Sequence, residues 1–226
     1  MKTQFRYFVG MTALTGLLLT IPPAQGQEVG QLYFAGDVGG SIFPDTDLEE
    51  YFGQNVSGSE VKFDPGIRLG FRAGYGLTDW FALEGETGLM ANEIDSIDGA
   101  SDADAVFSNV PFMLNARVHF PQYDRLTPYF GGGVGGSVAV LDADDIVIGG
   151  GRLDGNMSDV VFAYQGFAGL RCKLNENMGL SVEYRYFATL EPEWEPEEVF
   201  GPASSDDIRF GRIQGHMLSI AIDFRF

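Results

Sequence analysis

Ile67-Arg68-Leu69-Gly70-Phe71-Arg72-Ala73-Gly74-Tyr75 is the stretch that decides the fold, because its character changes at every residue. The odd-numbered positions are apolar, and the even-numbered positions are glycine or arginine. A period of two is typical of a β-strand with one face in an apolar medium, since successive side chains point to opposite faces. A register shift of one residue would exchange the two faces, so the pattern also predicts which side each residue occupies.

Seven further segments repeat this alternation, so the sequence predicts eight strands. The alternation is clear at 80–91, 112–120, 180–188 and 218–226. Glycine dilutes it at 31–43, 127–140 and 160–174. Glycine weakens a strand, but it also permits the bends and close contacts of a small, strongly coiled barrel.

The connections between these segments alternate in length. Short ones lie near 76–79, 121–126 and 175–178, and long ones span about 44–60, 92–105, 141–159 and 191–213. Short turns at one end and long loops at the other are typical of transmembrane barrels, with the short turns in the periplasm. We therefore predict an all-β fold, an eight-stranded antiparallel up-and-down transmembrane β-barrel, with both termini in the periplasm.

A soluble barrel of the lipocalin type is the structural alternative, because there the apolar face lines a ligand cavity. Strands of about ten residues and one-sided loop lengths favour the membrane barrel. Aromatic residues near the short turns favour it too, since they would form an interfacial girdle. These residues are Tyr75, Trp80, Phe81, Phe120, Tyr129 and Phe130.

If lipid lies outside, the polar face must fill the lumen, where a charge without a partner is costly. The charged residues predicted on this face are Arg68, Arg72, Arg117, Arg171, Lys173, Arg185 and Arg225, with Asp37, Glu84, Glu86, Glu183 and Asp223. If residues 77–79 form the turn between the second and third strands, Arg72 lies opposite Glu84. The same in-phase pairing sets Arg171 opposite Glu183. We predict both as buried ion pairs. Eight strands leave a bore that side chains can fill, so we expect a plug rather than a pore.

The first 26 residues predict export. Lys2 and Arg6 belong to a positive segment, residues 7–21 are apolar, and Ala24-Gln25-Gly26 has the small-x-small pattern of a signal-peptidase site. We expect cleavage at Gly26, which leaves residues 27–226 as one barrel domain. The 226-residue chain has a net charge of −18, so we do not expect nucleic acid as a partner. Its one cysteine, Cys172, excludes an intramolecular disulfide.

Three motifs resemble the small outer-membrane β-barrel proteins related to the OmpA transmembrane domain and the opacity-type surface proteins. They are residues 67–75, Thr127-Pro128-Tyr129-Phe130-Gly131-Gly132-Gly133-Val134-Gly135 and Leu180-Ser181-Val182-Glu183-Tyr184-Arg185-Tyr186, and a terminal phenylalanine follows them. The resemblance implies the outer membrane of a Gram-negative-type bacterium, contact with its lipids, and insertion by an assembly machinery that reads Phe226. It also implies a role in surface interaction or envelope integrity rather than catalysis.

The long connections hold most of the acidic residues, for example Asp45, Asp47, Glu93, Asp95 and Asp142. We expect a solvated surface that resists aggregation. Clustered carboxylates also suit calcium or magnesium, although the spaced ligands of an EF-hand are missing from the sequence. Divalent cations are therefore an expected partner without an assigned metal site, and no cofactor is expected.

An enzyme is the second functional hypothesis, because some small barrels hydrolyse or transfer the acyl chains of lipid A. That chemistry needs a nucleophile, a histidine and an orienting acid near the outer rim. His119 lies at the periplasmic end of its strand, and alternation turns His216 away from the lumen. We therefore predict a non-enzymatic barrel without catalytic residues, with a lipid A-modifying enzyme and a soluble exported ligand carrier as alternatives.

Overall fold

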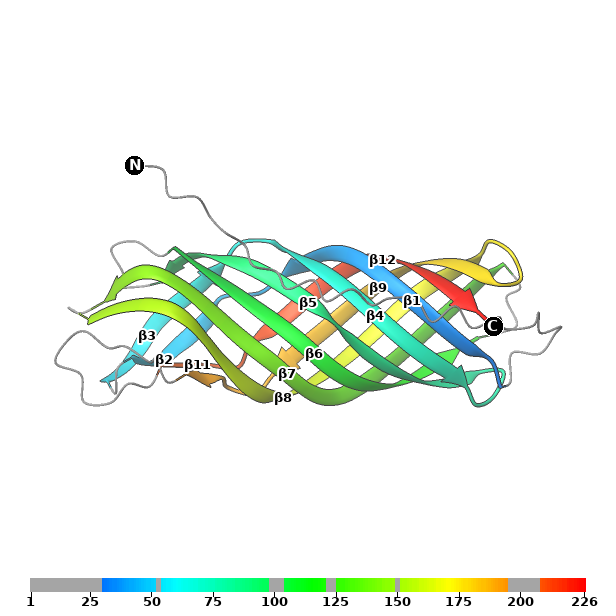
Figure 1. Cartoon of the computed structure of the whole chain (residues 1–226), viewed down its shortest axis with the longest axis horizontal. Coiled ribbons are helices and arrows are strands. Elements are labelled where there is room, and N and C mark those ends of the chain that lie inside the picture. Colours follow the sequence, from blue (N-terminus) through cyan, green and yellow to red (C-terminus); the bar gives the residue numbers. More distant parts are fainter. Residues whose placement is uncertain (1–29, 52–53, 98–103, 121–124, 149–150, 195–207) are drawn as a thin grey trace.

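The structure is a computed structural model that describes residues 30–51, 54–97, 104–120, 125–148, 151–194 and 208–226. All regular secondary structure in these ranges is β. These ranges contain no helix that is long and apolar enough to cross a membrane. Figure 1 shows an elongated barrel of tilted strands wrapped around one long axis. The predicted signal peptide, with its cleavage site at Gly26, lies outside the described residues.

Eight long strands form the closed ring. Each is antiparallel to its two neighbours, and the pairing of the first with the last closes the barrel. In ring order they are β1 (Leu32–Ile42), β4 (Gly66–Gly76), β5 (Phe81–Ile97), β6 (Asp104–His119), β7 (Leu126–Ile148), β8 (Gly151–Lys173), β9 (Met178–Thr189) and β12 (Gln214–Arg225). The predicted eight-stranded up-and-down barrel is confirmed.

The two ends of the barrel differ, as the connection lengths predict. At the turn end, β4 joins β5 and β8 joins β9 through tight turns, and the C-terminus lies at this same end (Figure 1). At the opposite loop end, β5 to β8 continue well beyond their expected limits, so that much of 92–105 and 141–159 is strand. The alternation continues there as well, with Ile94, Phe107 and Leu141 buried. The barrel therefore extends past the apolar band that a membrane would cover.

Four short strands lengthen the wall further at the loop end. They lie mostly within two of the predicted long loops, with β3 running three residues past the first, and they add to the edge of β5 in the order β3, β2, β11, β10. Their bounds are β2 (Thr46–Tyr51), β3 (Gln54–Phe63), β10 (Glu193–Trp194) and β11 (Ile208–Phe210). The sequence predicted long loops at 44–60 and 191–213, and both of these segments contain strands as well.

The predicted assignment of faces is confirmed along the ring. Leu69 and Leu114 are 43% and 62% exposed on the outer wall, whereas their neighbours Arg68 and Met113 are almost fully buried. Tyr75, Trp80 and Phe130 are exposed near the turn end, as a girdle requires. Tyr129 is an exception, because it is buried inside the barrel. An exposed apolar wall also rules out the lipocalin-type arrangement, in which that face would point inward.

The interior has two layers, of which the sequence predicted one. Charged and polar side chains fill the half nearer the turn end. The half nearer the loop end holds an apolar core that includes Met90, Phe107, Leu141, Met157, Phe187, Trp194, Phe210, Ile213 and Met217. Trp194 of β10 is 1% exposed, and its indole nitrogen donates a hydrogen bond to the Ala139 carbonyl at 3.2 Å. The lumen is thus filled by charges only in part.

Two inward glycines show how the crowded polar half is accommodated. A β-carbon at Gly70 would collide with the Asp37 carboxylate, and one at Gly179 would collide with the Arg171 guanidinium. These positions on β4 and β9 therefore leave the space in which the charged side chains meet. The glycines that dilute the strand pattern serve the close contacts expected of a narrow barrel.

Candidate functional site

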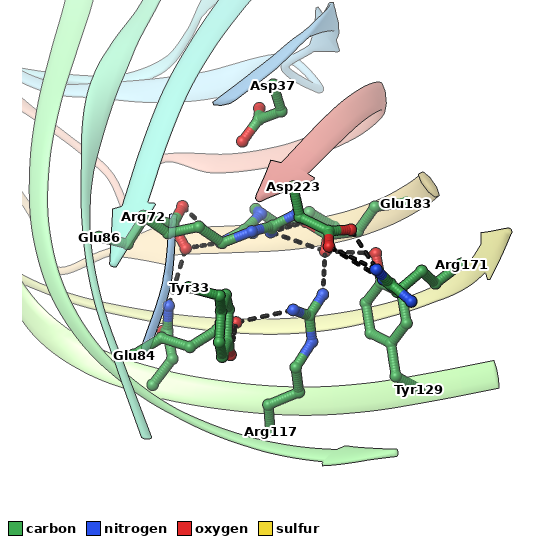
Figure 2. A network of polar contacts seen from close by, with 12 residues as sticks. Tyr33, Asp37, Arg72, Glu84, Glu86, Arg117, Tyr129, Arg171, Glu183 and Asp223 are labelled. Carbon is green, nitrogen blue, oxygen red and sulfur yellow. Dashed lines mark hydrogen bonds and ion pairs between the residues drawn. The ribbon is translucent and has the colours of Figure 1, made fainter. Parts of the chain in front are cut away.

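The charge network is the set of buried ionic side chains in the polar half of the interior. Seven of the eight ring strands contribute to it, and within the described residues five arginines meet five carboxylates. Its members are Asp37, Arg68, Arg72, Glu84, Glu86, Arg117, Arg171, Glu183, Arg185 and Asp223. Figure 2 shows labelled members of the network, among them Arg72, Arg117 and Glu183, pointing toward one another inside the barrel.

Glu86 of β5 is one centre of the charge network. One of its carboxylate oxygens lies 2.6 Å from an Arg68 nitrogen and 2.7 Å from an Arg185 nitrogen. The other accepts hydrogen bonds from the side-chain amides of Asn115 at 2.7 Å and Gln165 at 3.2 Å. Four strands besides β5 therefore contribute a donor to this one carboxylate.

Glu183 of β9 is the second centre. Arg72 and Arg185 approach its oxygens at 2.9 Å and 2.6 Å, and Arg117 lies at 3.5 Å. The Tyr129 hydroxyl donates a further hydrogen bond at 2.9 Å. Because Arg185 contacts Glu86 as well as Glu183, its guanidinium joins the two centres into one array.

Two outlying ion pairs and one hydrogen bond extend the array to the walls. Arg68 also bonds Asp37 at 2.9 Å. Arg117 pairs with Glu84 at 2.8 Å, and the Tyr33 hydroxyl donates to the same Glu84 oxygen at 2.6 Å. Asp37, Glu84, Glu86 and Glu183 therefore each lie beside at least one arginine.

Arg171 and Asp223 form the pair nearest the turn end. Two guanidinium nitrogens of Arg171 bind the Asp223 carboxylate at 2.8 Å and 2.7 Å, a bidentate geometry that fixes both side chains. Arg225 approaches the same carboxylate at 3.7 Å. A small pocket opens beside this pair, and His119, Thr127 and Tyr129 also line it.

Arg72, Glu84, Arg171 and Glu183, the four residues of the predicted ion pairs, are all buried, but each has a partner other than the predicted one. The register sets Arg72 opposite Glu86, and the Arg72 guanidinium pairs with Glu183 across the lumen. Glu84 pairs with Arg117. Arg171 lies opposite Ser181 and pairs with Asp223, two strands away.

The turns explain the register error. In the β4–β5 turn, the Thr78 hydroxyl accepts hydrogen bonds from the backbone nitrogens of Trp80 and Phe81, which makes 78–80 the loop instead of 77–79. In the β8–β9 turn, Asn175 accepts from the backbone nitrogens of Asn177 and Met178. Each turn lies one residue away from its expected position, which shifts the pairing by two and keeps the faces correct.

The central roles of Glu86 and Arg185 were missed by the sequence reasoning. Alternation placed both residues on the lumen face, but the contact that joins them crosses the barrel between β5 and β9, which are not neighbours. Such distances depend on strand stagger and barrel diameter, for which the sequence carries no local signal.

The two histidines lie at opposite ends of the barrel, as predicted. His119 lines the pocket at the turn end. His216 is exposed on the outer wall, and its Nδ1 lies 2.7 Å from the Tyr184 hydroxyl. Cys172 is a partly exposed free thiol.

Phe226 lies beside β1, where its backbone nitrogen donates to the Leu32 carbonyl at 3.0 Å and its ring meets Phe34 edge to face. Its role as an assembly signal stays a prediction. The same holds for divalent cations, because many of the acidic residues lie outside the described ranges. Within those ranges, no three metal-binding side chains are grouped as an ion would require.

Solved structures with the same fold come from outer-membrane proteins. OprG from Pseudomonas aeruginosa has a TM-score of 0.60 at 17% identity, with 89% of this chain and 99% of OprG covered. Neisserial surface protein A has a TM-score of 0.52 at 14% identity, covering 87% of this chain and 99% of that one. AlkL in DMPC bilayers also gives 0.52, at 19% identity, covering 90% and 94%. At these identities the likeness shows the fold alone.

The sequence comparisons assign the family. No curated protein matches the chain closely enough to count as a relative. The family described as "Outer membrane protein beta-barrel domain" matches residues 11–226, which is nearly the whole sequence. This match and the barrel place the protein in the outer membrane of a Gram-negative-type bacterium. The chain belongs to the outer membrane protein beta-barrel domain family.

Proposed function

We propose that the protein is a closed, non-enzymatic barrel that displays an acidic extracellular surface for contacts outside the cell or for envelope integrity. The observation that carries the proposal is the double filling of the interior, by the charge network in one half and the apolar core in the other. A conducting pore would need a continuous water-filled path. An eight-stranded bore is narrow enough for side chains to occupy it completely.

The charge network supports a closed barrel because its members hold one another across the axis. Moving Arg185 aside would break its contacts with both Glu86 and Glu183 in a region of low dielectric, where each separated charge is costly. The apolar core supports the same conclusion independently. Trp194 and Phe210 pack edge to face with ring centres 4.9 Å apart, and Trp194 also meets Phe107 edge to face at 6.2 Å.

The distribution of charge supports a surface role. The charge network is balanced, so the net charge of −18 must come from residues outside it. Exposed carboxylates at the loop end include Asp45, Asp47, Glu60, Glu93, Asp95, Asp142, Glu191 and Glu193. A surface of one sign attracts cationic partners and repels anionic ones, chiefly through the rate of encounter.

The environment of the histidines supports a non-enzymatic role. Acyl transfer needs a histidine that contacts a nucleophile and is oriented by an acid. The Nδ1 atom of His216 is engaged by the Tyr184 hydroxyl, and His119 lies inside the turn end, far from surface lipid in the proposed orientation. Mass spectrometry of lipid A from cells with and without the protein tests this point, and a lost or moved acyl chain would contradict it.

Conductance across planar bilayers tests the closed barrel. We expect the refolded protein to insert without steady current steps, whereas a porin recorded in parallel gives them. Trp194→Ala, which opens space in the apolar core, and Glu183→Gln, which removes a charge from the charge network, provide a comparison for each layer. A steady open channel in the unmodified protein would overturn the proposal.

A further inference from the structure

A compact group of polar and aromatic side chains stands on the outer wall, outside the charge network. We call it the wall cluster, and it consists of Tyr164 on β8, Tyr184 and Tyr186 on β9, and Gln214 and His216 on β12. His216 stacks on Tyr184 with ring centres 6.1 Å apart and lies 5.5 Å from the Tyr186 ring. The Tyr186 hydroxyl donates a hydrogen bond to the Gln214 side chain at 2.8 Å.

The wall cluster is local, which separates it from an ordinary aromatic girdle. The residue paired with His216 on β1 is Ile42, and the residue paired with Tyr164 on β7 is Val134. Both are exposed aliphatic side chains. The cluster therefore covers three adjacent strands and gives way to plain apolar wall on either side. A girdle that only anchors a barrel in lipid would continue around the ring.

On β12 the wall cluster lies at the upper edge of the apolar wall, whereas exposed Phe162 and Leu190 continue that wall toward the loop end beside Tyr164 and Tyr186. His216 is the third residue of β12, and Tyr186 lies three residues before the end of β9, so both are near the loop end. Toward the turn end, the wall continues with Val182, Leu218 and Ile220, which are all exposed and apolar. In the other direction along the chain comes Arg212, which is exposed two residues before Gln214 and alternates with the buried Gly211 and Ile213.

A side-chain group at this height stands beside lipid headgroups, because the acyl chains end where the apolar wall ends. In the orientation proposed above, these headgroups belong to the outer leaflet. Arg212 supplies a cation at the rim of a strongly acidic chain, and guanidinium groups bind phosphate through paired hydrogen bonds. Tyrosine hydroxyls and the imidazole supply donors and acceptors for sugar hydroxyls, and their ring faces can pack against sugar rings.

We propose that the wall cluster and Arg212 bind the phosphorylated sugar headgroup of an outer-leaflet glycolipid. Arg212 contacts the phosphate, and the wall cluster holds the adjoining sugar. The binding site lies on the outer wall and leaves the interior closed. The proposal rests on the proposed function only for its orientation, with the loop end outside the cell.

Binding of lipid A to the refolded barrel in detergent micelles tests the proposal, read by native mass spectrometry and titration. The test variant is Arg212→Gln combined with His216→Phe, which removes the charge and the imidazole nitrogens but keeps a ring. Loss of one charged hydrogen-bonding group lowers affinity by at least about tenfold. We expect that loss in the double variant, and a similar loss when lipid A without its phosphates replaces lipid A.

Arg125→Gln is the matched control, because Arg125 is also exposed but lies at the turn end. We expect it to bind lipid A like the unmodified protein. The changed side chains point outward, and the heat-dependent gel shift of folded barrels checks that every variant is folded. Equal affinity of the double variant and the control, or equal affinity for lipid A with and without phosphate, would overturn the proposal. Micelles have no leaflets, so this result is independent of the orientation, which surface labelling measures separately.

Discussion

At the scale of single residues, the burial of Glu183 is tolerated because its carboxylate has four partners. Arg72, Arg117 and Arg185 surround it, and Tyr129 donates to it. Removing one member of such a group leaves the others buried without compensation, which costs more than the pair itself contributes. The residue should therefore be sensitive even to a substitution that preserves its shape.

Glu183→Gln keeps the volume of the side chain and removes its charge. We expect the free energy of unfolding to fall by about 3–5 kcal/mol, since Arg72 and Arg185 lose a buried counter-charge. Urea unfolding in lipid vesicles, followed by tryptophan fluorescence, measures it. The control is Glu193→Gln, whose partner Arg209 lies in a half-exposed pair and whose loss should cost less than about 1 kcal/mol. Urea unfolding curves with equal midpoints and equal slopes for Glu183→Gln and Glu193→Gln would contradict the prediction.

Arg171 and Asp223 offer a test of the observed pairing against the predicted one. Charge reversal of either residue places two like charges in contact, so Arg171→Asp and Asp223→Arg should each lower the folded yield. The double reversal restores opposite signs and should recover most of that yield, as measured by the gel shift of folded barrels. Arg171→Glu with Glu183→Arg, the exchange that the sequence register suggested, should give no recovery. Recovery by this second exchange would show that the register in solution is the predicted one.

At the scale of strands, the sequence predicted faces well and partners poorly. The faces follow from the alternation of apolar and polar residues, and this alternation is independent of where a turn begins. Partners depend on the turn, and Thr78 accepts backbone hydrogen bonds in a way that moves the loop by one residue. Contacts such as Arg72 with Glu183 also cross the barrel, so they depend on the stagger of all eight strands.

Leu69 is the place to test the outward face of β4. We expect Leu69→Arg to lower the free energy of unfolding by about 2–4 kcal/mol, because a lipid-facing cation near mid-bilayer has no partner. The same unfolding assay in vesicles measures it. Asp79→Arg, a matched change at an exposed position in the β4–β5 turn, should leave stability within about 0.5 kcal/mol. If Leu69→Arg lowers the free energy of unfolding as little as Asp79→Arg does, Leu69 does not face lipid.

At the scale of the whole molecule, the apolar core is what the sequence reasoning did not foresee. Inward positions of β5 to β8 alternate in the same way inside and above the membrane, so periodicity alone marks no boundary between a polar and an apolar interior. Trp194 is the residue of the apolar core that alternation along the ring strands could not have predicted. It comes from a predicted loop, forms the two-residue strand β10, and is buried beneath the wall that β2, β3 and β11 add. The loop end is therefore a folded extension of the barrel.

The orientation of that extension is the property on which the surface role and the glycolipid site both depend. Single cysteines at the two ends test it, in a Cys172→Ala background that removes the one native thiol. We expect Ser101→Cys, in the connection between β5 and β6, to react with a membrane-impermeant maleimide in intact cells. Glu176→Cys, in the exposed β8–β9 turn, should react only after the outer membrane is permeabilised, because short turns face the periplasm. The reverse pattern would place the acidic end and the wall cluster in the periplasm, where no outer-leaflet headgroup is within reach.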